Sequence, residues 1–165
     1  MRPALPEDAA TIGFLRASVW NSTYRGIYPD ELLDQYPFEL YLEKDTLLLR
    51  SPLQHWYLFS DGERPVGYFS FGPYNYGSYQ DFTLCINHLY ILEDYHGMGL
   101  GKRAFSVIKE YCHQQHIQKF FCGCNANNLP AISFYRHMGG IQGDQADPTL
   151  PKKDQIIHFE FYLGD

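Results

Sequence analysis

The chain of 165 residues has no long apolar run, no paired cysteine pattern and no excess of positive charge. No uninterrupted apolar stretch approaches the roughly 20 residues that a membrane-spanning helix needs, so we expect no membrane partner. The four cysteines lack the spacing of a small secreted domain, which predicts reduced thiols in a cytoplasm. Lys and Arg number 13 against 19 Asp and Glu, and the resulting net charge of −6 disfavours nucleic acid as a partner.

Sequence features for export and for metal binding are also missing. Residues 1–8 lack the basic-then-apolar pattern of a signal peptide, so a cytoplasmic protein is expected. Cys122 and Cys124 lie on one side of a predicted strand, but no second pair of ligands has the spacing of a metal site. His113 and His116 share a helical face without a third ligand. We therefore expect buried free thiols, solvated histidines and no bound metal.

Aromatic residues are abundant, with 14 Tyr, 12 Phe and 2 Trp. Hydrophobic residues make up 45% of the chain and charged residues 19%, a composition typical of a globular protein. The length suits one domain over residues 1–165, with enough apolar surface for a substantial core. Aromatic side chains can build this core and can also line a cleft for flat or cationic ligands.

Hydrophobic periodicity and turn residues predict a mixture of helices and strands. Helices are expected from Pro6 to Trp20, from Pro29 to Tyr36, and over 38–50, 104–116 and 128–138. Strands are expected near 2–4 and over 56–59, 65–71, 82–92, 120–124 and 156–163. Residues 21–28 and 72–79 are expected to be loops, and Asp61-Gly62 to be the turn of a hairpin. This order predicts a mixed α/β sheet in a single domain.

A glycine-rich segment follows the predicted strand that ends at Leu92 and precedes a helix. It contains Gly97, Gly99 and Gly101, and its backbone N–H groups can cradle a phosphate or pyrophosphate at the helix N-terminus. The spacing is not that of a dinucleotide-binding fingerprint, and Arg103 stands where a Walker loop has Ser or Thr. A tight turn whose glycines only pack is the alternative interpretation of these residues.

Two motifs, separated by one predicted helix and one predicted strand, resemble the signatures of the GNAT family of N-acetyltransferases. The family's acetyl-CoA signature, Gln/Arg-x-x-Gly-x-Gly/Ala, matches here at His96, Gly99 and Gly101. A second signature, Asn-x-x-Ala-x-x-Phe-Tyr before a glycine turn, matches from Asn128 to Tyr135. The resemblance spans nearly the whole chain. It implies a GNAT-like α/β fold with a twisted, mixed, mostly antiparallel central sheet flanked by helices.

The resemblance implies an N-acetyltransferase that moves an acetyl group from acetyl-CoA directly to a primary amine of a small molecule or peptide. The co-substrate would lie along the strand before the glycine loop, on the loop itself and at the last helix. The implied cofactor-binding residues are Leu89, Tyr90, Ile91, His96, Gly97, Met98, Gly99, Leu100, Gly101, Lys102, Asn128 and Tyr135. The family usually has Gln or Arg in place of His96, which is either a pH-dependent pyrophosphate contact or a solvated loop residue.

The resemblance implies Tyr135 as the proton donor to the departing thiolate, a role that suits a phenol, with a core-edge aromatic as the alternative. An alkyl ammonium must lose a proton before it attacks, and His88 has the right chemistry to accept it. His88 and Asn87 are expected to point to opposite faces of their strand, so only one of them can meet the substrate. A structural role is the alternative for His88, and Asn87 can orient water instead.

Substrate contacts are expected from the first helical region and from Asn87. Trp20, Tyr24 and Tyr28 can form an amine site by cation–π contact, or can cover the core beneath a broken helix. Segment 143–154 is either a lid or an exposed hairpin loop. A non-catalytic CoA-binding sensor with the same fold is the second function that the sequence allows. A homodimer is compatible with either function.

Overall fold

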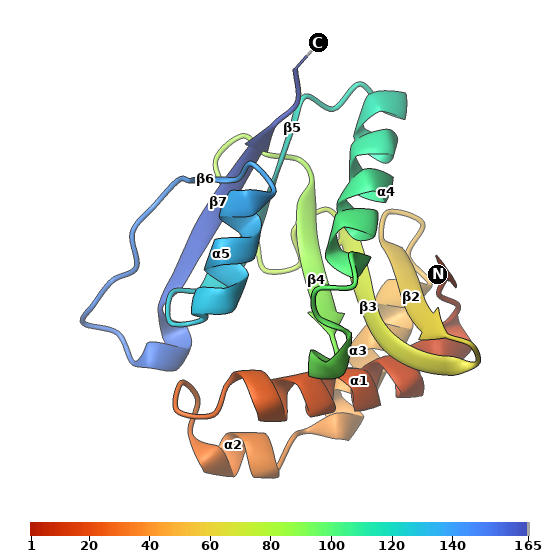
Figure 1. Cartoon of the computed structure of the whole chain (residues 1–165), viewed down its shortest axis with the longest axis vertical. Helices are drawn as coiled ribbons and strands as arrows, with labels where there is room; N and C mark the ends of the chain where they lie inside the picture. Colours follow the sequence, from red (N-terminus) through yellow and green to blue (C-terminus); the bar gives the residue numbers. More distant parts are fainter. Residues whose placement is uncertain (165) are drawn as a thin grey trace.

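The computed structural model describes residues 1–164 and, within them, a seven-stranded sheet covered by helices on both faces (Figure 1). The strands are β1 (Arg2–Pro3), β2 (His55–Asp61), β3 (Arg64–Gly72), β4 (Cys85–Ile91), β5 (Lys119–Asn125), β6 (Ile141–Gln142) and β7 (Ile156–Tyr162). The helices are α1 (Ala9–Thr23), α2 (Asp30–Asp34), α3 (Phe38–Leu49), α4 (Leu100–Gln114) and α5 (Leu129–His137). Short 3-10 turns lie at Pro6–Asp8, Glu93–Tyr95 and Lys152–Asp154.

The order of the strands across the sheet is β1-β2-β3-β4-β5-β7-β6. Strands β4 and β5 form the one parallel pair among the described strands, and the other neighbours are antiparallel. Helix α4 makes the crossover between the two parallel strands, as such a connection requires. The expected mixed, mostly antiparallel sheet flanked by helices is confirmed.

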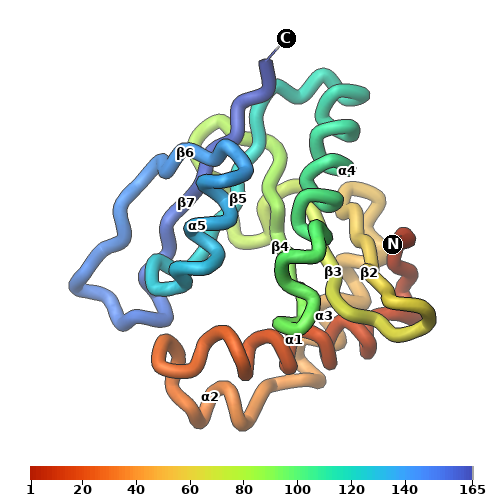
Figure 2. The backbone as a smooth tube through the Cα atoms, in the orientation of Figure 1, coloured from red at the N-terminus to blue at the C-terminus, as the bar shows by residue number. Residues whose placement is uncertain are grey.

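Strand β4 carries one extra residue, Asn87, relative to its neighbour β3. Ser70 pairs with His88 while the next residue, Phe71, pairs with Ile86, so Asn87 is the unpaired residue of a β-bulge. The parallel pairing with β5 stops at the same place, because Ile86 is the last residue of β4 with a partner on β5. Figure 2 shows the backbones of β4 and β5 lying apart on the side of the sheet nearest α1. The bulge and the loss of pairing together open the sheet.

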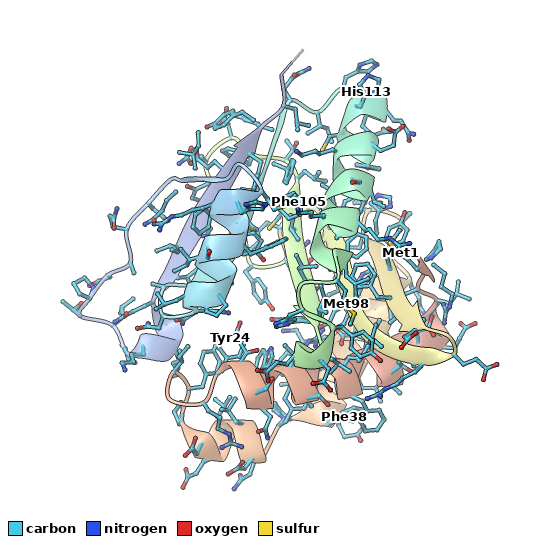
Figure 3. The ribbon with its side chains drawn as sticks, viewed as in Figure 1. Met1, Tyr24, Phe38, Met98, Phe105 and His113 are labelled. Atoms are coloured by element: carbon cyan, nitrogen blue, oxygen red, sulfur yellow. The ribbon has the colours of Figure 1, made fainter. Side chains whose placement is uncertain are left out.

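The sheet separates two apolar cores that hold helices on either side of this opening. One core lies beneath α4 and α5, where Phe105, labelled in Figure 3, packs edge-on against Phe134 and Phe161. The other lies beneath α1 and α3 and includes Ile12 of α1 and Trp56 of β2. Because both cores are closely packed, the helices bordering the opening are fixed in position.

The structure confirms the order of the predicted elements, adds the short strand β6, which was not predicted, and moves several boundaries. Helix α1 continues to Thr23, into the expected loop. Strand β4 begins only at Cys85, because residues 79–82 form a bridged turn in which Gln80 has a φ of 47°. Helix α4 begins at Leu100, earlier than expected, so that Gly101 of the glycine segment lies in its first turn. Within residues 1–164, no helix is long and apolar enough to cross a membrane.

A buried ion pair connects α1 to α3 beneath the sheet. Two nitrogens of the Arg16 guanidinium lie 2.9 and 3.0 Å from the two carboxylate oxygens of Asp45, and Arg16 Nε donates to the Tyr68 hydroxyl at 2.8 Å. The Arg16 and Asp45 side chains are 2% and 3% exposed. Charges removed from water to this extent are stable only when paired and hydrogen-bonded, so each of these groups needs the other.

We expect Asp45→Asn to lower the free energy of unfolding by about 3 kcal/mol, because the substitution keeps the volume but leaves the Arg16 charge buried without a counter-charge. Urea unfolding followed by circular dichroism measures this loss. The matched control is Asp30→Ala, which removes one carboxylate from Arg25, 3.1 Å away, in an exposed pair. Its cost should stay below about 1 kcal/mol. Equal losses in the two variants would contradict this account of the ion pair.

Candidate active site

The opening between β4 and β5 leads into a cleft of about 740 Å³. Its walls are the end of α1, residues 86–91 of β4, the glycine segment before α4, and the end of β5 with the start of α5. Most of the residues with a sequence-predicted role line this one cleft, and Trp20, Tyr28 and Met98 are the exceptions. The volume is that of a typical small-molecule or cofactor site.

The glycine segment presents the N-terminus of α4 to the cleft. Gly99 has a φ of 80°, a left-handed conformation that favours glycine, and it turns the chain into the helix. The first helical bond runs from Arg103 N–H to Gly99 O, at 3.0 Å. The amides of Leu100, Gly101 and Lys102 precede that bond, and such groups have no partner within a helix. Together with the partial positive charge of the helix end, they suit a phosphate group.

Gly101 also brings α4 and α5 into close contact. A β-carbon at this position would lie 2.7 Å from Cζ of Phe134, closer than atoms pack in proteins. The third glycine of the motif therefore serves packing, as the alternative interpretation of the sequence proposed, whereas Gly99 serves the turn.

His96 is exposed, and its ring contacts the backbone at the end of β4. Its Nε2 lies 2.9 Å from the backbone oxygen of Ile91, close enough for a hydrogen bond that holds the glycine segment to the end of β4. His96 is thus an exposed loop residue that is also attached to the backbone of β4, and its contact with pyrophosphate stays a prediction. The backbone amides of the segment and the Lys102 side chain are further groups at this wall that suit an anion.

Two residues of the second motif lie on the opposite wall of the cleft, one at the N-cap of α5 and one on the helix itself. Asn128 caps the helix, since its Oδ1 accepts a hydrogen bond from Ala131 N–H at 3.2 Å. The Tyr135 side chain is buried among the aromatic rings of the core and still borders the cleft. Burial raises the pKa of Tyr135 well above its usual range, so the phenol keeps its proton at neutral pH.

Tyr24 and Tyr28 stack on each other at the end of α1, with ring centroids 4.7 Å apart. Trp20 contacts both rings edge-on, so the three predicted aromatic residues form one cluster. Tyr24, labelled in Figure 3, lies toward α5, and its hydroxyl is beside Tyr90 and Asn128. Burial raises the pKa of Tyr24 and raises that of Tyr28 to about 12, which keeps both hydroxyls neutral.

The two candidates on β4 are both held by hydrogen bonds. His88 Nδ1 lies 2.7 Å from Ser70 Oγ, and burial together with the nearby Arg16 charge holds the pKa of His88 well below its usual range. His88 is therefore neutral at pH 7 and resists taking up a proton. Asn87 Nδ2 donates to Gln54 Oε1 at 3.2 Å and to Pro73 O at 3.0 Å, so its side chain anchors the loop after β3.

The last strand brings a histidine and a carboxylate together that the sequence analysis did not identify. His158 Nδ1 lies 2.6 Å from Asp144 Oδ2, between β7 and the segment that follows β6. The period-two pattern of the predicted strand 156–163 could have placed His158 and Glu160 on one face. Nothing in the sequence indicated that Asp144, in an irregular segment, would meet that face.

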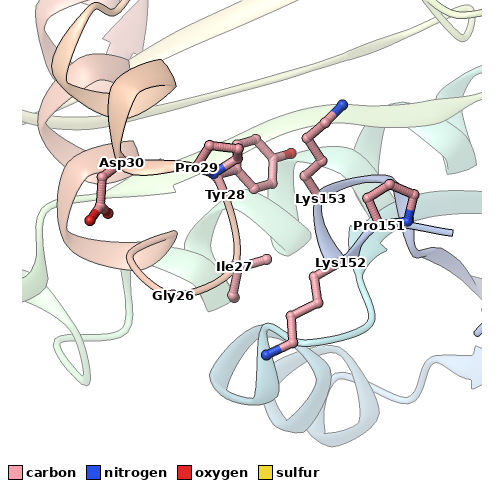
Figure 4. Close-up of a pocket in the computed structure, with 8 residues that line it drawn as sticks. All are labelled: Gly26, Ile27, Tyr28, Pro29, Asp30, Pro151, Lys152 and Lys153. Carbon is pink, nitrogen blue, oxygen red and sulfur yellow. The ribbon is translucent and has the colours of Figure 1, made fainter.

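Segment 143–154 also borders a second, shallower hollow of about 330 Å³. Figure 4 shows Tyr28 and Pro29 of the loop after α1 opposite Lys152 and Lys153 of this segment. The two segments, far apart in sequence, thus face each other. Ile27 lines both the hollow and the main cleft.

The described part of the chain contains no group of three His, Cys, Asp or Glu side chains arranged to hold a metal ion. The four cysteines are free thiols, with Cys85, Cys112 and Cys122 buried and Cys124 half-buried. Burial raises the pKa of Cys124 to about 12, so this thiol beside the cleft is protonated and unreactive at neutral pH.

Residues 11–139 match the sequence model of the Acetyltransferase (GNAT) family. A PaiA N-acetyltransferase from Thermoplasma acidophilum, solved in complex with coenzyme A, is similar over 98% of this chain and 96% of its own, with 19% identity and a TM-score of 0.80. An acetyltransferase from Thermus thermophilus is similar over 98% and 95%, with 20% identity and a TM-score of 0.68.

A ribosomal alpha-N-protein acetyltransferase (RimL) in complex with coenzyme A is similar over 98% of this chain and 92% of its own, with 14% identity and a TM-score of 0.70. No curated protein matches the sequence. At these identities the solved structures establish a shared fold, and the family match covers most of the chain.

We expect Gly101→Ala to destabilise the protein by about 1–3 kcal/mol, because the added methyl group forces the Phe134 ring out of its position. Urea unfolding of the single variant and of Gly101→Ala combined with Phe134→Leu measures the effect. The smaller leucine should recover part of the loss. Additive losses in the double variant would contradict a direct clash between these two positions.

Proposed function

The chain belongs to the GNAT acetyltransferase family, and we propose that it transfers the acetyl group of acetyl-CoA to a primary amine of a small molecule or peptide. The observation that carries the proposal is the cleft itself. A strand edge freed by the Asn87 bulge and a helix N-terminus preceded by glycines border the same 740 Å³ space. The first offers backbone groups to an extended amide-containing arm, and the second offers amides to a pyrophosphate.

Each part of the co-substrate has a complementary surface on this chain. The amides of Leu100 to Lys102 would bind the pyrophosphate oxygens. The backbone of Leu89, Tyr90 and Ile91, which has no partner on β5, would hold the pantetheine arm and could polarise the thioester oxygen. Asn128 and Tyr135 on α5 would contact the arm near its sulfur. In this arrangement the thioester lies at the point where β4 and β5 diverge.

In the reaction we propose, the neutral amine attacks the thioester carbon directly, with both partners held in one cleft. Binding them together removes much of the entropic barrier of a two-molecule encounter. Tyr135, which stays protonated, would donate its hydrogen to the sulfur as the carbon–sulfur bond breaks. Of the aromatic cluster at the end of α1, Tyr24 lines the cleft and would offer its ring to a cationic acceptor, while Trp20 and Tyr28 pack against Tyr24.

The first experiment measures thiol release from acetyl-CoA by the purified protein, with a panel of polyamines, amino sugars, amino acids and peptides. We expect release that depends on one class of amine, which would also identify the acceptor. Binding of acetyl-CoA by calorimetry without release by any amine would instead support the second function, a CoA-binding sensor. Absence of acetyl-CoA binding would contradict both functions.

Tyr135→Phe tests the proton donor. We expect its turnover with the best amine of the panel to fall by about 10²–10⁴-fold, while acetyl-CoA affinity stays unchanged because the ring and its packing remain. Tyr111→Phe on α4 is the matched control, since Tyr111 packs against His55 and Phe71 outside the cleft. Unchanged turnover in Tyr135→Phe would exclude this role for Tyr135.

A further inference from the structure

His158 and Asp144 form a carboxylate–imidazole pair on the sheet face opposite α4 and α5. Besides the Nδ1 contact of 2.6 Å, the backbone N–H of His158 donates to Asp144 Oδ1 at 2.7 Å, so both carboxylate oxygens are engaged by one residue. A carboxylate on Nδ1 holds the hydrogen of a neutral imidazole on that nitrogen, which leaves the lone pair on Nε2. A base oriented by a carboxylate in this way is a recurring catalytic arrangement.

The imidazole lies against the one residue of β5 that has no side chain. His158 pairs with Gly123, and a β-carbon on Gly123 would lie 3.5 Å from His158 Cδ2 and 3.6 Å from Nε2. Gly123 lines the cleft, at the wall that faces the freed part of β4. The separations of 3.5 and 3.6 Å are ordinary van der Waals distances, and Cγ2 of Ile156 lies 3.4 Å from the same position. The Nε2 edge of the ring is therefore within contact distance of a β-carbon position on the part of β5 that lines the cleft.

Within the described residues, the surrounding side chains fix the ring without forming a hydrogen bond to its Nε2 atom. Tyr79 stacks on the imidazole with the ring centroids 4.3 Å apart, and the side chain keeps 16% of its surface exposed. The other nearby carboxylate, Glu160, accepts hydrogen bonds from the hydroxyls of Tyr79 and Tyr162 at 2.8 and 2.7 Å. By contrast, His88 has a hydroxyl rather than a carboxylate on Nδ1 and is buried beside Arg16.

We propose that His158 is the general base that deprotonates the acceptor amine, and that Asp144 is its positioning residue. This assignment rests on the proposed acetyl transfer. It predicts a primary alkyl ammonium as the acceptor class, because such a group, with a pKa of about 10.4, stays protonated at pH 7 without a base. Segment 143–154, which carries Asp144, is then part of the active site.

The reaction consumes one ammonium and one thioester and conserves their protons and electrons. The ammonium gives one proton to Nε2, and its nitrogen lone pair forms a bond to the thioester carbon. The carbon–sulfur bond breaks with its electron pair on sulfur, and Tyr135 donates a proton to the sulfur. Tyr135 regains a proton from the nitrogen of the new amide, and the imidazolium releases its proton to solvent. The products are the acetylated amine, the thiol and one proton.

A comparison of two nucleophiles distinguishes a catalytic role of His158 from a structural one. We expect His158→Gln to lower turnover with the best alkyl amine by about 10²-fold or more. Turnover with hydroxylamine, which is neutral at pH 7 and needs no base, should fall less than threefold. His113→Gln, at an exposed position near the end of α4, is the matched control and should leave both rates unchanged.

Three results would overturn the assignment. Unchanged alkyl-amine turnover in His158→Gln would show that His158 is not the base. Equal losses with both nucleophiles would show a structural role. No turnover by the unmodified protein with any amine or with hydroxylamine would refute the proposed transfer itself, and so distinguishes failure of the function from failure of the base.

Asp144→Asn provides a second test that holds even if His158→Gln fails to fold. Without the carboxylate on Nδ1, the imidazole loses the group that orients it and that pairs with the imidazolium formed in the step. Turnover with the alkyl amine should therefore fall by about 10-fold or more, while turnover with hydroxylamine should fall less than threefold. Equal losses with the two nucleophiles would show that Asp144 only supports the fold.

Discussion

Strand β4 can pair with both of its neighbours only as far as Ile86, because the extra residue Asn87 changes its direction. A continuous sheet would satisfy these backbone groups internally and would leave no opening in the middle of the molecule. With the bulge, the backbone of residues 87–91 on the β5 side faces a cleft. Unpaired backbone groups need partners, and here a ligand arm can supply them. The binding of acetyl-CoA that we propose depends on this interruption.

The walls of the cleft are rigid because each belongs to a separate packed layer. On one face, the contact of Gly101 with the Phe134 ring sets the spacing of α4 and α5. On the other, the Arg16–Asp45 pair connects α1 to α3 beneath the sheet. The aromatic cluster at the end of α1 then faces α5 across the opening. Such preorganisation lets the cleft align two substrates without rearranging its own groups.

Much of the fold and part of the site could be predicted from the sequence. Periodicity located most helices and strands, and the glycine segment indicated an anion site because it directly precedes a helix, whose N-terminus presents free backbone N–H groups. The bulge at Asn87 could not be predicted, since it depends on the register between two strands and not on local pattern. The pairing of His158 with Asp144 was missed for a similar reason: β6, at Ile141–Gln142, is too short to show a strand pattern, and it is what directs Asp144 toward β7.

We expect the freed edge of β4 and the N-terminus of α4 to bind acetyl-CoA together. A titration of the ¹⁵N-labelled protein with acetyl-CoA, followed through its backbone amide signals, tests it most directly. We predict that the largest shifts fall on two separate groups of amides, residues 89–91 and 99–102, and that both change at the same ligand concentration. Shifts confined to one group, or centred on another surface, would contradict the claim.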